Sequence, residues 1–252
     1  MTQQQALYNY ALRLGDNSLI LSARLSEWCS NAPFLEEDLA LTNMALDLIG
    51  RAQAMLKYAG EVEGKGRTED DLAYRRGERD YYNHLIMELP NGDFAYTMVR
   101  QLFVSTYELF FFEELQKSTD ATLAAIAAKT LKEVKYHHLH AKDWVIRLGD
   151  GTAESNARVQ KAVNALWMYT GEMFEMDHAD TMLLKEGIAV NTDNLKLGWI
   201  QMVTQILALA NIDLPADGYM QTGGRKGIHT EYLGHILSEM QYLQRAYPDA
   251  TW

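Results

Sequence analysis

The residues of this chain that could bind a metal are glutamates and histidines at helical spacing. Glu175 and His178 form the only Glu-x-x-His motif in the sequence. On a helix, side chains three residues apart lie on the same face. Di-iron carboxylate proteins use this motif twice, together with one glutamate from each of two further helices. A single copy cannot complete such a centre, and a solvated acidic helix face explains Glu175–His178 better.

Two other pairs, Leu48–Arg51 and Val134–His137, have the same i,i+3 spacing on amphipathic stretches. In a di-iron helix bundle, such inward positions hold glutamate and histidine. Leucine, valine and arginine cannot ligate iron, and a lone histidine lacks the anionic oxygens that a hard iron centre needs. The two pairs indicate either a di-iron-type bundle that has lost its metal or ordinary core positions. The residues alone leave both readings open.

Arg51 carries a specific structural expectation if its helix face points inward. An unpaired charge in a protein interior is very costly, so a buried guanidinium needs a carboxylate partner. Glu108 and Asp16 are the candidate acids, and Glu108 is slightly favoured. We therefore predict that Arg51 is buried and bonded to an acidic residue of a neighbouring helix.

A basic and aromatic cluster stands out in this acidic chain. Arginine binds phosphate through two parallel hydrogen bonds, and tyrosine can stack on adenine. A solvated helix with internal ion pairs is the simpler alternative. The cluster consists of Arg75, Arg76, Arg79, Asp80, Tyr81 and Tyr82. The glycine-rich run 223–227 lacks the spacing of a phosphate-binding P-loop, and we expect it to be an ordered loop that docks against a partner.

The elements that position these residues are predicted to be helices. Only four prolines occur, and none lies between residues 91 and 214, which favours long helices. Apolar residues recur at steps of three and four, and no alternating strand pattern competes. The sequence therefore predicts one all-α domain over residues 1–252. The expected long helices are 7–29, 41–55, 94–115 and 123–148, and further helices are expected at 69–88, 153–185, 192–211 and 229–246.

Composition narrows the class of protein. The chain has 252 residues and a formal net charge of −11, which argues against a general binder of nucleic acid or anionic membranes. The single cysteine, Cys29, suits a reducing compartment. No signal peptide and no membrane span is apparent. We expect a cytoplasmic protein.

Sequence runs at both ends of the chain resemble the PaaC family, and the resemblance covers nearly the whole chain. The runs are Leu14–Ser18, Ser26–Cys29, Asp38–Leu41, Asp47–Gly50, Thr222–Gly234 and Glu239–Leu243. The resemblance implies a ferritin-like four-helix bundle with additional C-terminal helices. It also implies a structural, non-catalytic subunit of the multicomponent phenylacetyl-CoA epoxidase, in which O2 epoxidises the aromatic ring.

The resemblance further implies the cofactors and partners. The related subunit PaaA would hold the di-iron centre, PaaB would complete the oxygenase, and a reductase subunit with FAD, an iron–sulfur centre and NADPH would supply electrons. This chain would bind no cofactor. Beside the catalytic relative, Leu48 and Val134 stand at glutamate positions and Arg51 at a histidine position, while His137 is retained.

Coenzyme A carries phosphates and adenine, so the resemblance makes residues 75–82 a candidate edge of a phenylacetyl-CoA site shared with the partner. Two other functions compete with the structural role. One is an active di-iron oxygenase that uses Glu175, His178, His137 and Glu108. The other is a free-standing scaffold or regulator unrelated to oxygenases.

Overall fold

The computed structural model describes residues 1–216, 218–248 and 250, and over these residues it contains helices and loops but no β-strand. The chain groups into two compact units. Unit 1 comprises residues 1–90 and 222–252, and unit 2 comprises residues 91–221. No described helix combines the length and the hydropathy that crossing a bilayer would require.

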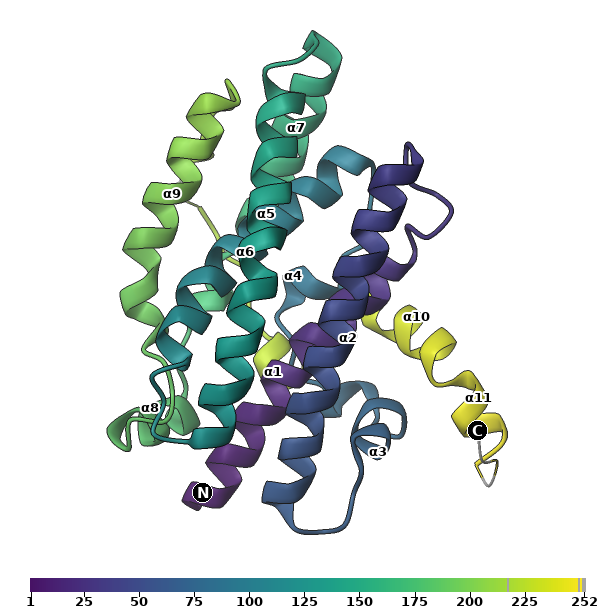
Figure 1. Cartoon of the computed structure of the whole chain (residues 1–252), viewed down its shortest axis with the longest axis vertical. Coiled ribbons are helices and arrows are strands. Elements are labelled where there is room, and N and C mark those ends of the chain that lie inside the picture. Colours follow the sequence, from purple (N-terminus) through teal and green to yellow (C-terminus); the bar gives the residue numbers. More distant parts are fainter. Residues whose placement is uncertain (217, 249, 251–252) are drawn as a thin grey trace. The chain divides into compact units, whose positions relative to one another are not determined.

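Unit 1 is built on two long helices, α1 and α2, that pack side by side along their length (Figure 1). α1 starts at a capping box, in which the Thr2 side chain accepts a hydrogen bond from Gln5 N–H and the Gln5 side chain bonds back to Thr2. α2 ends at Gly64, whose positive φ of 72° suits glycine. The helices are α1 (Gln3–Ser26), α2 (Leu35–Glu63), α3 (Glu69–Tyr74), η1 (Glu78–Asp80), α4 (Leu85–Glu88), η5 (Gly224–Lys226), α10 (Glu231–Met240) and α11 (Tyr242–Ala246).

Unit 2 packs α6, α7 and α9 around the apolar helix α5. An aromatic cluster forms its core, where Trp199 stacks edge-on against Phe103 and donates its indole N–H to the Phe103 carbonyl at 2.9 Å. Burying such large rings contributes much of the apolar area that stabilises a small unit. The helices are α5 (Phe94–Leu115), α6 (Ala121–Gly149), α7 (Ala153–Leu166), η2 (Trp167–Tyr169), η3 (Gly171–Phe174), α8 (His178–Lys185), η4 (Thr192–Leu195) and α9 (Lys196–Leu209).

The all-α class and the four long helices are confirmed, and two of the further predicted helices, 69–88 and 153–185, are wrong. The expected helix 69–88 is interrupted after Tyr74 and returns only as η1 and α4. The expected helix 153–185 breaks after Leu166, where η2 and η3 follow. Asp177 then caps a new helix, α8, by accepting hydrogen bonds from Ala179 and Asp180 N–H. A single domain over the whole chain stays a prediction.

Candidate functional site

In unit 1, the side chains of Leu48 and Arg51 are buried on α2. The Arg51 guanidinium donates from Nε to the Ser18 hydroxyl at 2.8 Å, and this hydroxyl in turn donates to the Leu14 carbonyl at 3.0 Å. The prediction that Arg51 points inward is therefore confirmed. Arg51 is therefore a buried cation inside unit 1.

Asp16, one of the two candidate acids for Arg51, is bonded to a different arginine, Arg76. Its fully buried carboxylate accepts hydrogen bonds from both terminal nitrogens of Arg76, the one from Nη1 at 3.0 Å, and a third from Tyr82 N–H at 2.9 Å. Arg76 satisfies both oxygens of Asp16 in a fork-like pair, which leaves no need for a second guanidinium. Glu108 is buried on α5 in unit 2, and its pairing with Arg51 stays a prediction.

The second pair, Val134 and His137, is buried on α6 of unit 2. Val134 belongs to the apolar core stripe that the sequence predicted. A di-iron centre needs several carboxylate oxygens turned toward one point, and within the described residues no three His, Cys, Asp or Glu side chains gather as such a site requires. Because Leu48 and Val134 offer no oxygen and Arg51 adds a positive charge, these positions do not fit a di-iron centre.

Glu175 and His178 do not form the helical motif that the active-oxygenase reading needs. Glu175 follows η3 with extended backbone, and His178 is the first residue of α8. Both residues are exposed, and the helix cap Asp177 lies between them. Since the two side chains do not share one helix face, the geometry gives the motif no role in binding iron.

Residues 75–82 divide into a buried set and an exposed set. Arg76 is buried: besides Asp16 it reaches the Asp80 carbonyl at 2.6 Å and lies 4.1 Å from the Tyr81 ring centre. Tyr81 is fully buried, and burial raises the pKa of its phenol well above the ordinary value. These two side chains hold the loop together from inside and are not available to a ligand.

The exposed set consists of Arg75, Arg79 and Asp80, and Tyr82 is half-buried. Arg75 forms a surface ion pair with Asp71 at 3.3 Å. Isolated surface pairs of this kind contribute little energy, so Arg75 could exchange its partner for a phosphate. The sequence cluster is thus only partly a surface on which coenzyme A could bind.

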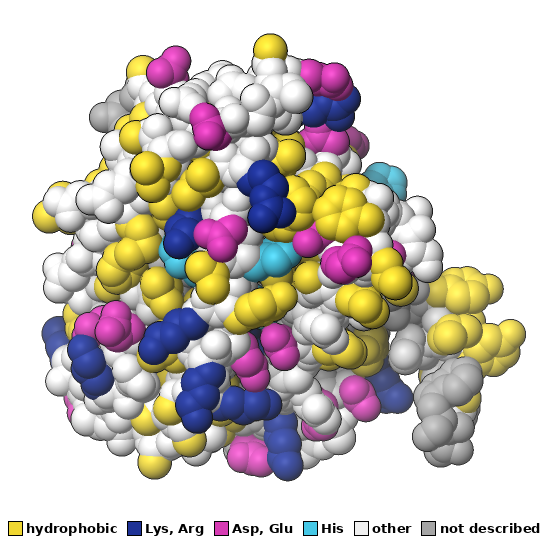
Figure 2. Space-filling view, turned by 45° about the horizontal axis from the view of Figure 1, so that its top comes forward, with side chains coloured by type: hydrophobic (Ala, Val, Ile, Leu, Met, Phe, Trp, Pro, Cys, Tyr) yellow, Lys and Arg dark blue, Asp and Glu magenta, His cyan; other side chains and the backbone are white. Residues whose placement is uncertain are grey.

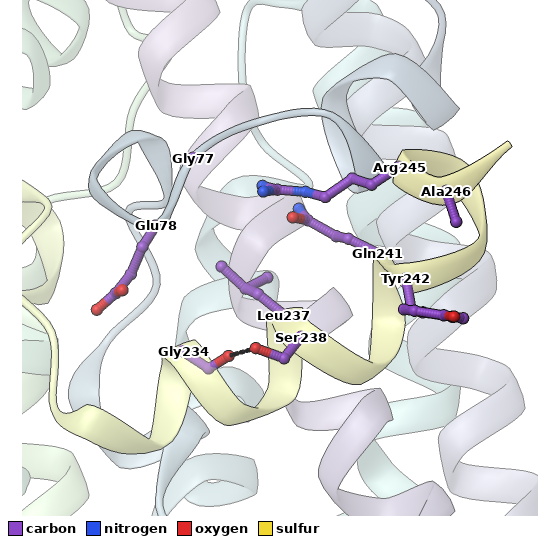
Figure 3. A pocket seen from close by; sticks show the side chains of 9 residues that line it. All are labelled: Gly77, Glu78, Gly234, Leu237, Ser238, Gln241, Tyr242, Arg245 and Ala246. Atoms are coloured by element: carbon purple, nitrogen blue, oxygen red, sulfur yellow. Dashed lines mark hydrogen bonds between the residues drawn. The ribbon is translucent and has the colours of Figure 1, made fainter. Parts of the chain in front are cut away.

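A surface pocket of about 720 Å³ lies between this loop and the C-terminal helices of unit 1 (Figure 3). Glu78 lines one side, and the Arg245 guanidinium and the exposed Tyr242 ring line the other. Arg245 donates to the Arg76 carbonyl at 3.2 Å, and Gln241 donates to the same carbonyl and to the Tyr81 hydroxyl, at 3.1 and 2.8 Å. In the sequence, the i,i+3 spacing of Tyr242 and Arg245 could have indicated that the two side chains lie on the same side of one helix.

The C-terminal segment is held onto unit 1 by a buried carboxylate, Glu88. Its Oε1 accepts from Thr230 N–H at 2.6 Å and from the Thr230 hydroxyl at 2.8 Å. Its Oε2 accepts from Asn83 Nδ2 at 2.9 Å and lies 2.8 Å from His229 Nδ1. The other ring nitrogen of His229 lies 2.8 Å from the Tyr81 carbonyl, which can only accept. Both ring nitrogens therefore face acceptors, which favours the imidazolium.

Burial alone would lower the pKa of His229, but the hydrogen bond to Glu88 and its charge outweigh burial and raise that pKa. Sequence reasoning missed this pair. The available signal was an acid within the apolar run 85–89.

The glycine-rich run 223–227 docks onto its own chain. A Cβ at Gly224 would lie 2.2 Å from the Asn83 carbonyl oxygen, and a Cβ at Gly227 would lie 2.2 Å from the Arg79 carbonyl oxygen. Gly227 also has a φ of 71°, which favours glycine. These glycines therefore allow close approach of two backbones.

Comparison with known proteins agrees with the helical architecture. The family model described as "Phenylacetic acid catabolic protein" (PaaA_PaaC) matches residues 1–252. A relative from Escherichia coli (strain K12), named as one of the subunits of 1,2-phenylacetyl-CoA epoxidase, is 48% identical over 243 residues, which cover 96% of this chain and 98% of the relative. The family match covers the whole chain, and the match to this relative covers nearly all of it. The chain belongs to the PaaA/PaaC family of phenylacetic acid catabolic proteins.

Proposed function

We propose that this chain is the structural, non-catalytic subunit of a 1,2-phenylacetyl-CoA epoxidase that acts in phenylacetate catabolism. The relative whose name makes it a subunit of that enzyme supports the assignment to the epoxidase. The observation that supports the non-catalytic role is the burial of Leu48, Arg51 and Val134, three residues that cannot ligate iron. The family resemblance implies that these residues stand where the catalytic relative has ligands.

The proposed assembly is a cytoplasmic hetero-oligomer. The catalytic subunit PaaA would hold the di-iron centre, PaaB would complete the oxygenase, and the reductase would deliver electrons from NADPH through FAD and an iron–sulfur centre. In this arrangement the present chain binds no cofactor. It contributes a closed, rigid bundle against which a catalytic bundle that must open for a CoA thioester can pack.

Buried polar pairs explain how the chain stays closed without a metal. The Asp16–Arg76 pair joins α1 to the loop after α3, and the Glu88–His229 pair joins α4 to the segment before α10. Each pair is buried and satisfied by further hydrogen bonds, which is the condition under which a buried ion pair specifies one arrangement.

Only the exposed part of residues 75–82 would border the phenylacetyl-CoA site. Arg75, Arg79, Asp80 and Tyr82 are the residues that a phosphate or adenine could reach. Arg76 and Tyr81 would act only by shaping the loop. Arg245 lies in the pocket beside this loop and adds a third cation to Arg75 and Arg79.

Reconstitution tests the proposal. Purified PaaA, PaaB and reductase should oxidise NADPH in response to phenylacetyl-CoA only when this chain is added. His137→Gln in this chain should leave kcat within about twofold, because a side chain that binds no metal adds nothing to transition-state stabilisation. A loss of kcat by about a hundredfold, with assembly and KM unchanged, would show that the chain is catalytic. Full activity without the chain would show that it is no subunit.

A further inference from the structure

The outward face of α2 carries a row of exposed apolar side chains. Leu35 is 70% exposed, Leu39 55%, Leu46 61% and Ile49 38%. The polar residues Thr42, which is half-buried, and Gln53, which is exposed, continue the same spacing. The six positions follow one another at alternating steps of four and three residues. This spacing averages 3.5 residues and is that of the a and d positions of a coiled coil. The row is called the α2 seam below, and its members are Leu35, Leu39, Thr42, Leu46, Ile49 and Gln53.

α2 does not need this seam for its own packing. Its other face supplies buried side chains, which include Leu41, Met44, Ala52 and Met55. A surface helix of a monomeric domain has one apolar stripe and an otherwise polar surface. Single exposed leucines are common, but four exposed apolar side chains that recur from Leu35 to Ile49, over about 21 Å at 1.5 Å per residue, mark an interaction site.

The surface beside the seam is hollowed. A groove of about 180 Å³ lies between α2 and α3, and Leu46, Ile49 and Gly50 form its α2 side. At Gly50 a Cβ would meet no atom within 4 Å, so the helix surface is locally open. In helix pairs of this kind, a side chain of one helix fits into a hole between side chains of the other.

The charges around the seam indicate what kind of helix fits. Glu36 lies at its N-terminal end, and Glu69 and Asp70 border the groove, whereas Lys57 is the nearest exposed cation along α2, because Arg51 is buried. With a chain charge of −11, a second copy would place acid against acid. A helix with lysine or arginine at its edges would be attracted instead. Hydrophobic side chains that reach solvent between charged ones are also visible on the face shown in Figure 2.

We propose that the α2 seam is the docking surface for an amphipathic helix of another subunit, apolar along its centre and basic at its edges. The inference rests on the proposed function, because it needs the chain to work in a hetero-oligomer. It goes further by assigning the surface and the chemistry of the partner.

The test uses Leu46→Glu, with Leu209→Glu as the matched control. Leu209 is also a solvent-facing leucine on a helix, α9, and is 64% exposed. Each variant is mixed with PaaA and PaaB, and assembly is measured by gel filtration with light scattering and by titration. We expect Leu46→Glu to weaken assembly by about tenfold or more, since one truncated or charged anchor residue can dominate an interface. Leu209→Glu should assemble like the wild-type chain.

Two further measurements keep the test independent of folding. A photo-crosslinking phenylalanine analogue at position 46 of the full chain should label a lysine- or arginine-flanked helix of another subunit. Glu36→Lys with Glu69→Lys should slow association, and added salt should reduce the difference.

The possible results test the α2 seam and the proposed function separately. A wild-type chain that does not assemble contradicts both. Assembly that Leu46→Glu leaves unchanged, or crosslinks at position 46 no stronger than at 209, overturns the seam alone. Crosslinks to a second copy of this chain assign the surface to self-association and overturn the proposal as well.

Discussion

Replacing Glu88 should destabilise the chain in a way that depends on pH. Glu88→Ala removes an acceptor that serves the Thr230 backbone N–H and hydroxyl, the Asn83 amide and the His229 ring. Removing one member of a buried ion pair typically costs about 3–5 kcal/mol, because the partner charge is left without compensation. Against a total stability of about 5–15 kcal/mol, this is a large fraction.

Glu88→Gln should cost less, about 1–3 kcal/mol, the range for an unsatisfied buried polar group. The glutamine oxygen can still accept both Thr230 hydrogen bonds, and its amide can donate to Nδ1 of a neutral His229. Only the donor Asn83 then lacks its acceptor. The free energies of unfolding of Glu88→Ala and Glu88→Gln, compared with each other, show how much the charge of Glu88 contributes to stability relative to the shape of its side chain.

The pH dependence follows from the raised pKa of His229. A histidine with a folded pKa above its unfolded value of about 6.5 stabilises the fold fully below that pH. This contribution is lost as the pH rises through the folded pKa. The wild-type chain should therefore lose stability on going from about pH 6 upward, and Glu88→Gln should remove most of that slope.

The assay is guanidinium unfolding followed by circular dichroism at several pH values, with hydrogen exchange of residues 222–247 as a local readout. Glu231→Gln is the control, because Glu231 is exposed on the neighbouring helix α10. Glu231→Gln should behave like the wild-type chain. Equal stability of Glu88→Gln and the wild-type chain, with the same slope above pH 6, would refute the buried ion pair.

Three further predictions concern unit 1. Burial, with further contributions from Arg225 and Arg13, lowers the pKa of His84 to about 3. The neutral His84 therefore stabilises the fold above about pH 6.5, and this stabilisation is lost as the pH falls toward 3. In the same unfolding assay, His84→Phe should make the free energy of unfolding depend less on pH in this range. Gly224→Ala should lower the melting temperature by several degrees in a thermal melt, because its Cβ would collide with a backbone oxygen, whereas Gly218→Ala should not. Arg79→Ala should raise the KM for phenylacetyl-CoA with assembly intact, and an unchanged KM would make Arg79 an ordinary surface residue.

The long helices could be predicted because their signal is local and periodic. α5 and α6 follow an apolar repeat over more than six turns with no proline, and their observed bounds lie close to the predicted ones. The two predicted helices that were wrong, 69–88 and 153–185, are segments in which a local sequence pattern competes with tertiary packing. Asp177, for example, is an ordinary acid in the sequence and becomes a helix cap only because the chain turns there.

The inward position of Arg51 could be predicted because it depends only on the face of one helix. The acid that pairs with Arg51 depends on residues far apart in the chain; Asp16 bonds to Arg76, and pairing with Glu108 stays a prediction. The same reason hides the Glu88–His229 pair, whose members are separated by 141 residues. For residues 75–82 the sequence shows the cluster but not which of its side chains fold inward.

Iron binding by the isolated chain tests the structural role most directly. After anaerobic loading with Fe(II) and removal of free metal, elemental analysis should find no iron above background in the purified chain. Leu48, Arg51 and Val134 give the physical reason, since none can ligate iron. About two tightly bound irons per chain, the content of a di-iron site, lost on changing His137 to Ala, would contradict the account.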